Sequence, residues 1–324
     1  MKTNAIIRIV LFSLGILILT AILLTALGFK FFIVDTNLIT TEEYPLPVVS
    51  DGYHSSGSAN ADAIRNLDIE WVAGTITITP QEDIYEIIAT ENCGNEKYQM
   101  VYAVSGDTLK IQFCEDSIKF PNFGINYNFS KDLHITVPSS WRCDELSIDA
   151  AASDVTINTL NVNEVDFDGA SGQLNFHGCN VFNLDIDTAS GDVEFDGTLE
   201  NLDFEAASAS FHGTVHNCPT RLLMDSLSGK LNLSLPSDCG FTLYRDSLTG
   251  SFSSDFEIID QGGARIHGDG SCRIEVSGLS GNVNINKHHT DSPADCTDPN
   301  CTDTSHKHQS AKSTQTHHNE SEHH

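Results

Sequence analysis

The chain has 324 residues, with 17 Lys and Arg against 45 Asp and Glu, which gives a formal net charge of −28. A polyanion of this size repels phosphate backbones, so nucleic acid is excluded as a main partner. Glycine (23 residues) far outnumbers proline (9) and methionine (3), a composition that favours turn-rich β structure over helical bundles.

The first predicted element is a transmembrane helix over residues 9–29. These 21 residues include no charged side chain, and a helix of that length spans about 31 Å, which matches the hydrocarbon core of a bilayer. Because Lys2 and Arg8 precede the run and acidic residues follow it, we expect residues 1–8 in the cytoplasm and the rest of the chain outside. A cleaved signal peptide is the alternative, but the run is long for one and no A-x-A site precedes Lys30.

Two segments without periodic apolar residues flank the central part of the chain. Residues 30–61 are rich in Pro, Gly and Ser towards their end, which predicts an extracellular linker. Residues 288–324 contain eight of the 14 histidines and no Val, Leu or Ile, which predicts a disordered tail. Residues 62–287 remain, and they are enough for one packed domain.

A repeat runs through this central domain. From the second unit onward its turns are 19, 19, 18, 20, 21 and 31 residues apart. Seven and five positions before each turn, and two after it, the residue is apolar in every unit except at Arg245. The units align on a small turn residue: Gly74, Ser153, Gly172, Gly191, Ala209, Gly229, Gly250 and Gly281.

The pattern predicts two short strands per unit, each with one buried face. A period near twenty is typical of one coil of a β-solenoid, so we expect an all-β fold, a parallel β-solenoid of stacked coils. A β-sandwich is the alternative. The long interval between Gly250 and Gly281 predicts an inserted loop, and residues 98–113 predict an antiparallel hairpin that caps the stack.

Several motifs resemble the bacterial DUF4097 family, whose members are described as candidate adhesins built from β-strand repeats. The motifs are LHITVP at residues 133–138, the recurring A-S-G-D-V-x-F, LSLP at 233–236 and VSGLSGNVNI at 276–285. The resemblance covers nearly all of residues 62–287. It implies a surface-exposed β-repeat domain, often tethered to the membrane, with no established chemistry and no functional residues to carry over.

An acidic column is the clearest polar feature. Stacked carboxylates about 4.8 Å apart repel by about 0.9 kcal/mol per pair in water. Each carboxylate could accept N–H groups from the turn that follows, or the row could bind Ca²⁺ or another hard cation. The column lies four residues before each turn: Glu70, Asp149, Asp168, Asp187, Glu205, Asp225 and Asp246, with Ser277 at its end.

Nine cysteines behind an export segment predict disulfides. Cys218 and Cys239 share the position eleven before the turn in consecutive units and are the first candidate pair. Cys93 and Cys114 flank the predicted hairpin and are the second.

The tail carries the candidate metal ligands. Imidazoles in this pattern predict weak capture of Zn²⁺ or Ni²⁺, with a solvated flexible end as the alternative, and no other cofactor is expected. The candidate ligands are His306, His308, His317, His318, His323 and His324.

These observations predict a single-pass, membrane-tethered protein whose central domain binds an envelope or extracellular ligand outside the cell, in the manner of an adhesin or scaffold. We expect no catalytic activity, because no His, Arg or Lys recurs beside the acidic column to act as a base or electrophile. An enzyme acting on envelope glycans and a metal-binding protein that uses its tail are the alternatives.

Overall fold

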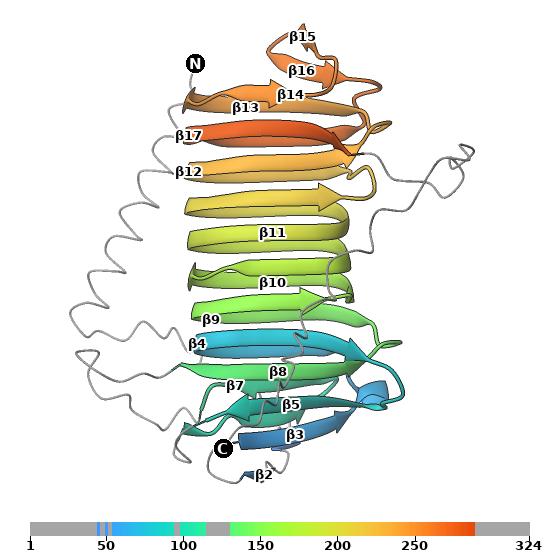
Figure 1. The fold of residues 1–324 in the computed structure, drawn as a ribbon, viewed down its shortest axis with the longest axis vertical. Coiled ribbons are helices and arrows are strands. Elements are labelled where there is room, and N and C mark those ends of the chain that lie inside the picture. Colours follow the sequence, from blue (N-terminus) through green and yellow to red (C-terminus); the bar gives the residue numbers. More distant parts are fainter. Residues whose placement is uncertain (1–43, 46–48, 51–53, 94–97, 115–129, 289–324) are drawn as a thin grey trace, which may run out of the picture. The chain divides into compact units, whose positions relative to one another are not determined.

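The computed structural model describes residues 44–45, 49–50, 54–93, 98–114 and 130–288. Within them the chain forms an all-β, mostly parallel sheet that winds into a stack of coils (Figure 1). The described helical structure is a short 3₁₀ turn, η1 (Ala61–Ala63), and no helix among these residues is long and apolar enough to cross a membrane. The predicted anchor at 9–29 and the tail beyond His288 lie outside the described residues.

The coils follow the predicted repeat. Asp168 pairs with Asp149 on one side and with Asp187 on the other, which is the register that the turn alignment predicts. The prediction of a β-solenoid-like fold is therefore confirmed, and the β-sandwich is wrong. The strands of the coils are β4 (Asn66–Gln81), β9 (Cys143–Asn158), β10 (Asn161–Ser171), β11 (Leu174–Val215), β12 (Arg221–Pro236), β13 (Phe241–Thr249), β14 (Phe252–Ser254) and β17 (Cys272–His288).

The three predicted apolar columns form the core. The residues seven positions before the turn are all buried: Leu67, Leu146, Val165, Leu184, Leu202, Leu222, Leu243 and Ile274. In the other two columns the exceptions are Arg245 and Phe252, which are only partly buried and both belong to the coil of Gly250. Aromatic side chains add a stack along the axis, with the rings of Phe176 and Phe195 at 5.4 Å. Burial of one apolar stripe per coil is what holds the coils together.

Glycine is required at four of the turns because neighbouring coils approach closely there. Gly191 has a φ of +127°, and a Cβ added to it would lie 1.9 Å from the carbonyl oxygen of Gly172 in the preceding coil. Gly74, Gly172 and Gly250 have the same conformation and the same clash with a neighbouring carbonyl. The backbones therefore pack at a distance that a side chain would prevent.

The order of the last coils differs from the order along the chain. Gly229 pairs with Gly281, and Thr249 pairs with Ser280, so β17 lies between β12 and β13. The expectation that consecutive units always stack on each other is therefore wrong at this end. The coil of Gly281 has a complete set of buried apolar residues, whereas the coil of Gly250 contains Arg245 and the half-buried Phe252. The complete coil takes the inner position, where both of its edges are covered.

The predicted inserted loop forms a cap at this end of the stack. β15 (Ile259–Gln261) and β16 (Ala264–His267) form an antiparallel hairpin, and β16 pairs antiparallel with β13. The cap covers the outer edge of β13, which would otherwise present unpaired backbone groups.

The other end of the stack is capped as the sequence predicts. β6 (Val101–Ser105) and β7 (Thr108–Gln112) form the predicted hairpin. β7 and β8 (Lys131–Pro138) pair in parallel with the two halves of β4 and so provide one further coil, which the sequence repeat did not reveal. β5 (Glu86–Asn92) covers the edge of β8 in antiparallel pairing.

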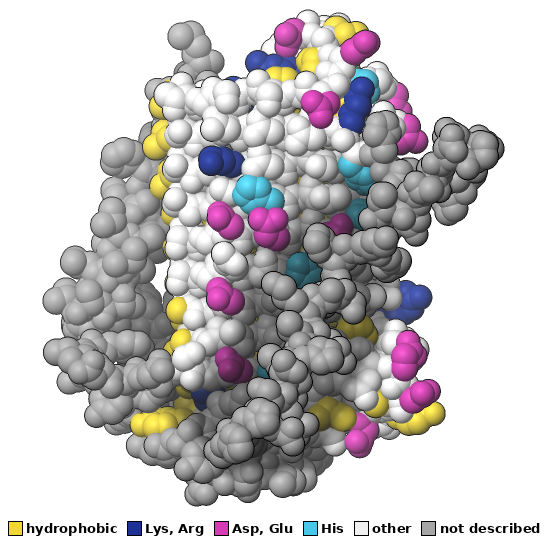
Figure 2. Space-filling model, viewed as in Figure 1, with side chains coloured by type: hydrophobic (Ala, Val, Ile, Leu, Met, Phe, Trp, Pro, Cys, Tyr) yellow, Lys and Arg dark blue, Asp and Glu magenta, His cyan; other side chains and the backbone are white. Residues whose placement is uncertain are grey.

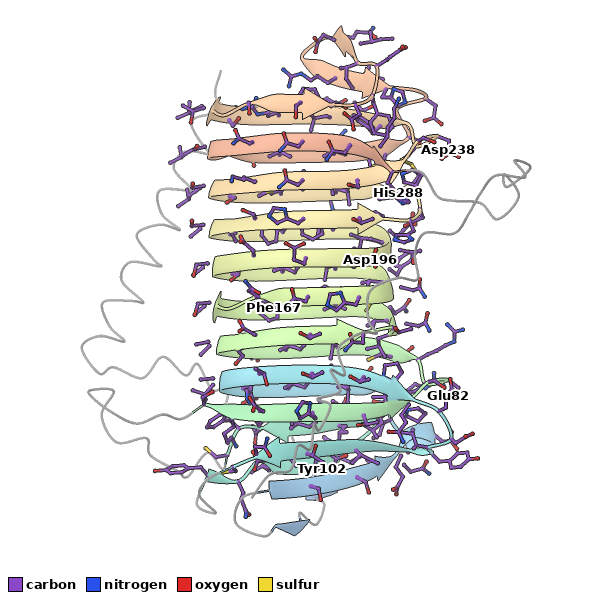
Figure 3. The ribbon with its side chains drawn as sticks, viewed as in Figure 1. Glu82, Tyr102, Phe167, Asp196, Asp238 and His288 are labelled. Atoms are coloured by element: carbon purple, nitrogen blue, oxygen red, sulfur yellow. A yellow bond between two sulfur atoms is a disulfide. The ribbon has the colours of Figure 1, made fainter. Side chains whose placement is uncertain are left out.

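The sheet begins before the predicted domain boundary at residue 62. β1 (Tyr44–Pro45), β2 (Val49–Ser50) and β3 (His54–Asn60) fall inside the range assigned to the linker, and β3 pairs with β5 along its whole length. The small residues of β3 have a packing role, because the ring of Tyr102 would lie 2.9 Å from a Cβ at Gly57. Tyr102 is buried at this end of the stack (Figure 3). Residues 54–60 are thus an edge strand and not a spacer.

Candidate functional site

The acidic column exists as a row across the first strands of the coils. Glu70 pairs with Asp149, and Glu205 pairs with Asp225, in continuous parallel register. Ser277 lies between Asp225 and Asp246 and does not end the row, because β17 is inserted there.

A second acidic row, which the sequence analysis missed, runs beside the first. Asp166 pairs with Asp185, and Asp203 lies in the following coil, each two residues before a carboxylate of the first row. Residues two apart in a strand share a face, so the two rows make one acidic face. The carboxyl pKa is raised along this face, first by partial burial and then by neighbouring carboxylates, for Asp149, Asp168, Asp185, Asp187, Glu205 and Asp225.

Three carboxylates of the first row, Asp149, Asp168 and Asp187, do not hold the turns. Among the described residues, no hydrogen bond reaches the side chains of Asp149, Asp168 or Asp187. The turns are instead held by side chains one position after the turn residue: Asp154 accepts the N–H of Gln173 at 2.9 Å, and Asp192 accepts that of Ser210 at 3.2 Å. The local Asx-type bond is therefore not formed by Asp149, Asp168 or Asp187, and the side chains of a different column bond to the next coil instead.

The metal predictions concern the acidic face and the histidine tail. Within the described ranges no three His, Cys, Asp or Glu side chains are grouped closely enough to hold a metal ion. Cation binding by the acidic face stays a prediction. His306, His308, His317, His318, His323 and His324 all lie outside the described residues.

The structure joins Cys218 to Cys239 in a disulfide, with their Cα atoms 5.2 Å apart. The pair is the one that the sequence predicts, although the reason differs. The coils of the two residues are not neighbours, and Cys239 lies in the connection from β12 to β13 that must cross the intervening β17. That crossing brings Cys239 back to Cys218.

The second predicted bridge is not formed. Cys93 and Cys114 are both buried thiols, and the thiol of Cys93 donates to the carbonyl oxygen of Tyr98 at 3.5 Å. Three other cysteines, Cys143, Cys179 and Cys272, are buried thiols without a disulfide. Burial raises the pKa of Cys143 and of Cys272 to about 12, which makes both thiols poor nucleophiles.

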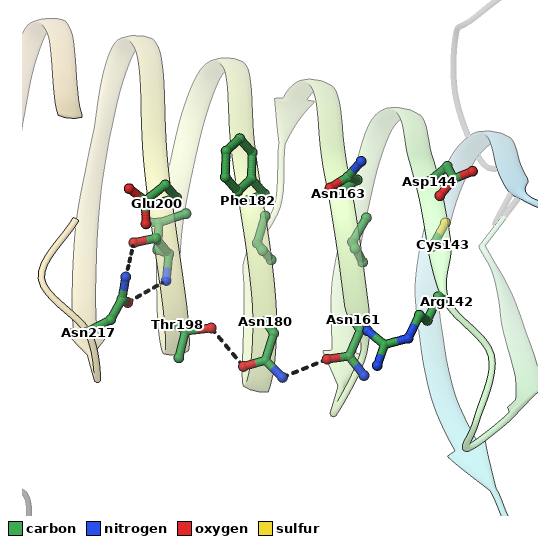
Figure 4. Close-up of a pocket in the computed structure, with 13 residues that line it drawn as sticks. Arg142, Cys143, Asp144, Asn161, Asn163, Asn180, Phe182, Thr198, Glu200 and Asn217 are labelled. Atoms are coloured by element: carbon green, nitrogen blue, oxygen red, sulfur yellow. Dashed lines mark hydrogen bonds between the residues drawn. The ribbon is translucent and has the colours of Figure 1, made fainter. Parts of the chain in front are cut away.

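An open groove crosses the start of the first strands in four consecutive coils, and it encloses about 340 Å³ (Figure 4). Its floor consists of Cys143, Val162, Val181 and Leu199, all buried. Because side chains alternate along a strand, the residues on either side of each floor residue point outward and form two walls.

The first wall, which we call the amide wall, consists of Asn161, Asn180 and Thr198, with Arg142 at one end and Asn217 at the other (Figure 4). Asn180 donates to Asn161 Oδ1 at 2.7 Å and accepts from the hydroxyl of Thr198 at 2.7 Å. Asn217 exchanges two hydrogen bonds with the backbone of Leu199, at 2.9 and 3.0 Å. These bonds run from coil to coil and fix the side chains in line.

The second wall, the Phe182 wall, consists of Asp144, Asn163, Phe182 and Glu200 in one row (Figure 4). Phe182 is 54% exposed although it is a large apolar side chain. The sequence signal for the groove was present as polar–apolar–polar triplets such as Asn161-Val162-Asn163, but an alignment centred on the turns did not follow that column.

The opposite face of the stack, formed by the second strands, is polar and largely uncharged. On the face shown in Figure 2, the coloured Asp, Glu, Lys and Arg side chains are scattered among white atoms. Amide side chains link its coils: Asn232 bonds His212 at 2.9 Å, and Asn284 donates to Asn232 Oδ1 at 2.6 Å. Ser253 donates to Asn284 Oδ1 at 2.6 Å. A continuous series of side-chain hydrogen bonds therefore links β11, β12, β17 and β14 in their spatial order.

The stacked coils, the capped ends and the rows of outward side chains define a β-solenoid-like repeat protein. The chain belongs to the Toastrack DUF4097 family, whose model matches residues 64–212 and 139–286. No curated protein matches the chain.

The solved structures that the chain resembles are distant in sequence. A candidate adhesin from Bacteroides fragilis is 15% identical with a TM-score of 0.45, over 72% of this chain and 96% of that one. A candidate adhesin from Parabacteroides distasonis is 11% identical with a TM-score of 0.37, over 74% and 98%. A candidate lipid-binding protein from the same species is 15% identical with a TM-score of 0.31, over 74% and 98%.

Proposed function

We propose that this protein is a membrane-tethered, cell-surface binding or scaffold module, adhesin-like in its mode of action, that binds an envelope or extracellular ligand without catalysing its conversion. The observation that carries the proposal is the unbroken register of the coils. Each outward column is a row of side chains repeated at the strand spacing, and in the amide wall hydrogen bonds between coils hold the side chains in place. Such a surface is preorganised for an extended partner.

The proposed topology follows from the sequence. Residues 9–29 would span the membrane once, with the basic residues Lys2 and Arg8 on the cytoplasmic side and the coils outside. The net charge of −28 and the acidic face oppose nucleic acid as a partner. In this proposal binding requires no cofactor, and the disulfide between Cys218 and Cys239 fits an oxidising compartment.

The test is protease shaving of intact cells that express the full chain with a C-terminal epitope. We expect added protease to remove the epitope and to release fragments of residues 62–287, while a cytoplasmic marker stays intact. Protection of the epitope until the cells are lysed would contradict the extracellular assignment. Turnover of any envelope glycan by the purified full chain, lost in Asp168→Asn, would contradict the non-catalytic assignment and favour the enzyme.

A further inference from the structure

The groove has features that select its ligand. It runs across the strands over four coils, and three strand spacings of about 4.8 Å give a length of about 14 Å. Each coil contributes one floor residue and one residue to each wall, so the groove repeats the same arrangement at every coil. A ligand that fits it is linear, with units close to the strand spacing in length.

The walls disfavour charged and apolar ligands. The groove contains one positive side chain, Arg142, and two negative ones, Asp144 and Glu200. The chain as a whole has a net charge of −28. Both charges repel an anionic polymer. An apolar ligand would cover amide groups without hydrogen-bonding them, which is costly. An uncharged ligand that carries many hydroxyl groups avoids both penalties.

The amide wall has unused hydrogen-bonding capacity. Asn161 accepts from Asn180, but within the described residues its own amide N–H groups have no acceptor. Asn163, on the other wall, is exposed and makes no side-chain hydrogen bond to the described residues. An amide both donates and accepts, which matches neighbouring hydroxyl groups that do the same. The bonds already made between coils hold these amides in line before any ligand arrives.

Phe182 provides the apolar part of the site. Its ring stands exposed in the middle of the Phe182 wall, between Asn163 and Glu200 (Figure 4). A sugar ring presents C–H groups on one face and hydroxyl groups at its rim, so it can cover an aromatic ring while its rim bonds to amides. A peptide in extended conformation rises by about 3.4 Å per residue and does not match the strand spacing.

We propose that this groove binds an uncharged oligosaccharide, one sugar unit per coil, with Phe182 under one sugar ring and Asn161, Asn163 and Asn180 bonded to hydroxyl groups. The inference rests on the proposed function, since it assigns the ligand class of the surface module. It also differs from the enzyme alternative, because the groove lies beside the acidic face and uses none of the carboxylates of its first row.

The test is calorimetric titration of the purified full chain, in mild detergent, with neutral oligosaccharides of two to six units: chito-, cello-, manno- and malto-oligosaccharides. We expect at least one series to bind, with affinity rising up to about four units and then levelling, as the four coils require. Phe182→Ala should weaken binding at least tenfold, and Asn163→Ala several-fold. Phe182→Trp should keep it.

Tyr85→Ala is the matched control, because Tyr85 is an 82% exposed aromatic residue outside the groove. It should leave binding unchanged, and each variant is checked for an unaltered melting temperature. Absence of binding in all four series, or binding unaffected by Phe182→Ala, would overturn the inference. Tighter Phe182-dependent binding of an extended hexapeptide would overturn it as well. None of these results depends on the shaving experiment, so the ligand class and the cell-surface location can fail separately.

Discussion

Asp149, Asp168 and Asp187 lie side by side in three neighbouring coils, and their pKa values are raised because partial burial and the adjacent carboxylates disfavour the charged form. A carboxyl with a raised pKa binds its proton more tightly in the folded state than in the unfolded state. Its contribution to stability is therefore full below the unfolded pKa and is lost as the pH rises through the folded pKa. At neutral pH the acidic face lowers the stability of the fold.

Replacing Asp187 by Asn should therefore stabilise the protein at neutral pH. Asp187 has a carboxylate neighbour on each side, and each pair repels by about 0.9 kcal/mol in water. After screening by salt and solvent we expect a gain of about 0.5 to 1 kcal/mol, or about 1 to 4 °C in melting temperature. Calorimetric scans from about pH 8 to about pH 4 should show the gain shrinking as the carboxylates take up protons.

The control for this prediction is Asp238→Asn, an exposed aspartate in the turn between β12 and β13. It should change the melting temperature much less. A lower melting temperature for Asp187→Asn at neutral pH would mean that the carboxylate is stabilised by a bound cation, which is the alternative interpretation of the row.

Among the elements, the cap formed by β5, β7 and β8 contains the one deeply buried ion pair of the described residues. Lys131 and Glu91 are 5% and 2% exposed and form a salt bridge. The ammonium group of Lys131 also donates to the carbonyl oxygens of Tyr98, at 2.8 Å, and Phe113. It lies 4.0 Å from the ring centroid of Phe113 and 4.6 Å from that of Trp71. Burial lowers the pKa of Lys131, although Glu91 opposes this effect.

These bonds connect Lys131 in β8 to Glu91 in β5 and to the backbone at Tyr98 and Phe113. The ion pair therefore holds the segments of the cap together. Lys131→Met should cost about 3 to 5 kcal/mol, because it leaves the Glu91 carboxylate buried without its counter-charge. The double variant Lys131→Met with Glu91→Leu should recover much of that loss. A double-mutant cycle by chemical denaturation measures both, and simple additivity of the two single changes would contradict the assigned coupling.

For the molecule as a whole, the position of β17 has a topological consequence. β12 and β13 precede β17 in the sequence, but β17, the last described strand, lies between them in the sheet. The connection from β12 to β13 must therefore span a strand that comes later in sequence. The disulfide between Cys218 and Cys239 fastens this connection to the coil before it.

Loss of this disulfide should destabilise the fold by about 3 kcal/mol, as expected for a closed loop of this size. That corresponds to a decrease of about 6 to 12 °C in melting temperature for a domain of this length. Reductant should lower the melting temperature of the wild-type chain and leave that of Cys218→Ser with Cys239→Ser unchanged. An equal effect of reductant on both proteins would show that the disulfide is not the stabilising link.

Much of the architecture was accessible from residue patterns. A turn residue, two apolar positions before it and one after it recur in every unit except at Arg245, and these columns became the core, from Leu67 to Ile274. The pattern works because burial of one face per strand depends only on local alternation and on a fixed repeat length. The hairpin of β6 and β7 was predictable for the same reason, since its turn and both strands are adjacent in the chain.

The order of the coils was decided by the tertiary structure alone. The apolar stripe of one coil can pack on that of any other, so the sequence specifies which face is buried but not which coil is the neighbour. β17 takes the inner position because its coil buries more apolar side chain than the coil that contains Arg245 and the half-buried Phe252. This difference matters only when the two coils compete for the same place in the stack. β3 escaped prediction similarly, because its small residues matter only once Tyr102 lies against Gly57.

The groove likewise exists only in three dimensions. Asn161, Asn180 and Thr198 come from three successive coils. Phe182 lies between Asn163 and Glu200 only because the register of the coils aligns these residues. Alternation within each strand determined that these side chains point outward. Their assembly into two aligned walls required the stacking of coils, because residues 18 or 19 positions apart become neighbours only when the backbones between them pair.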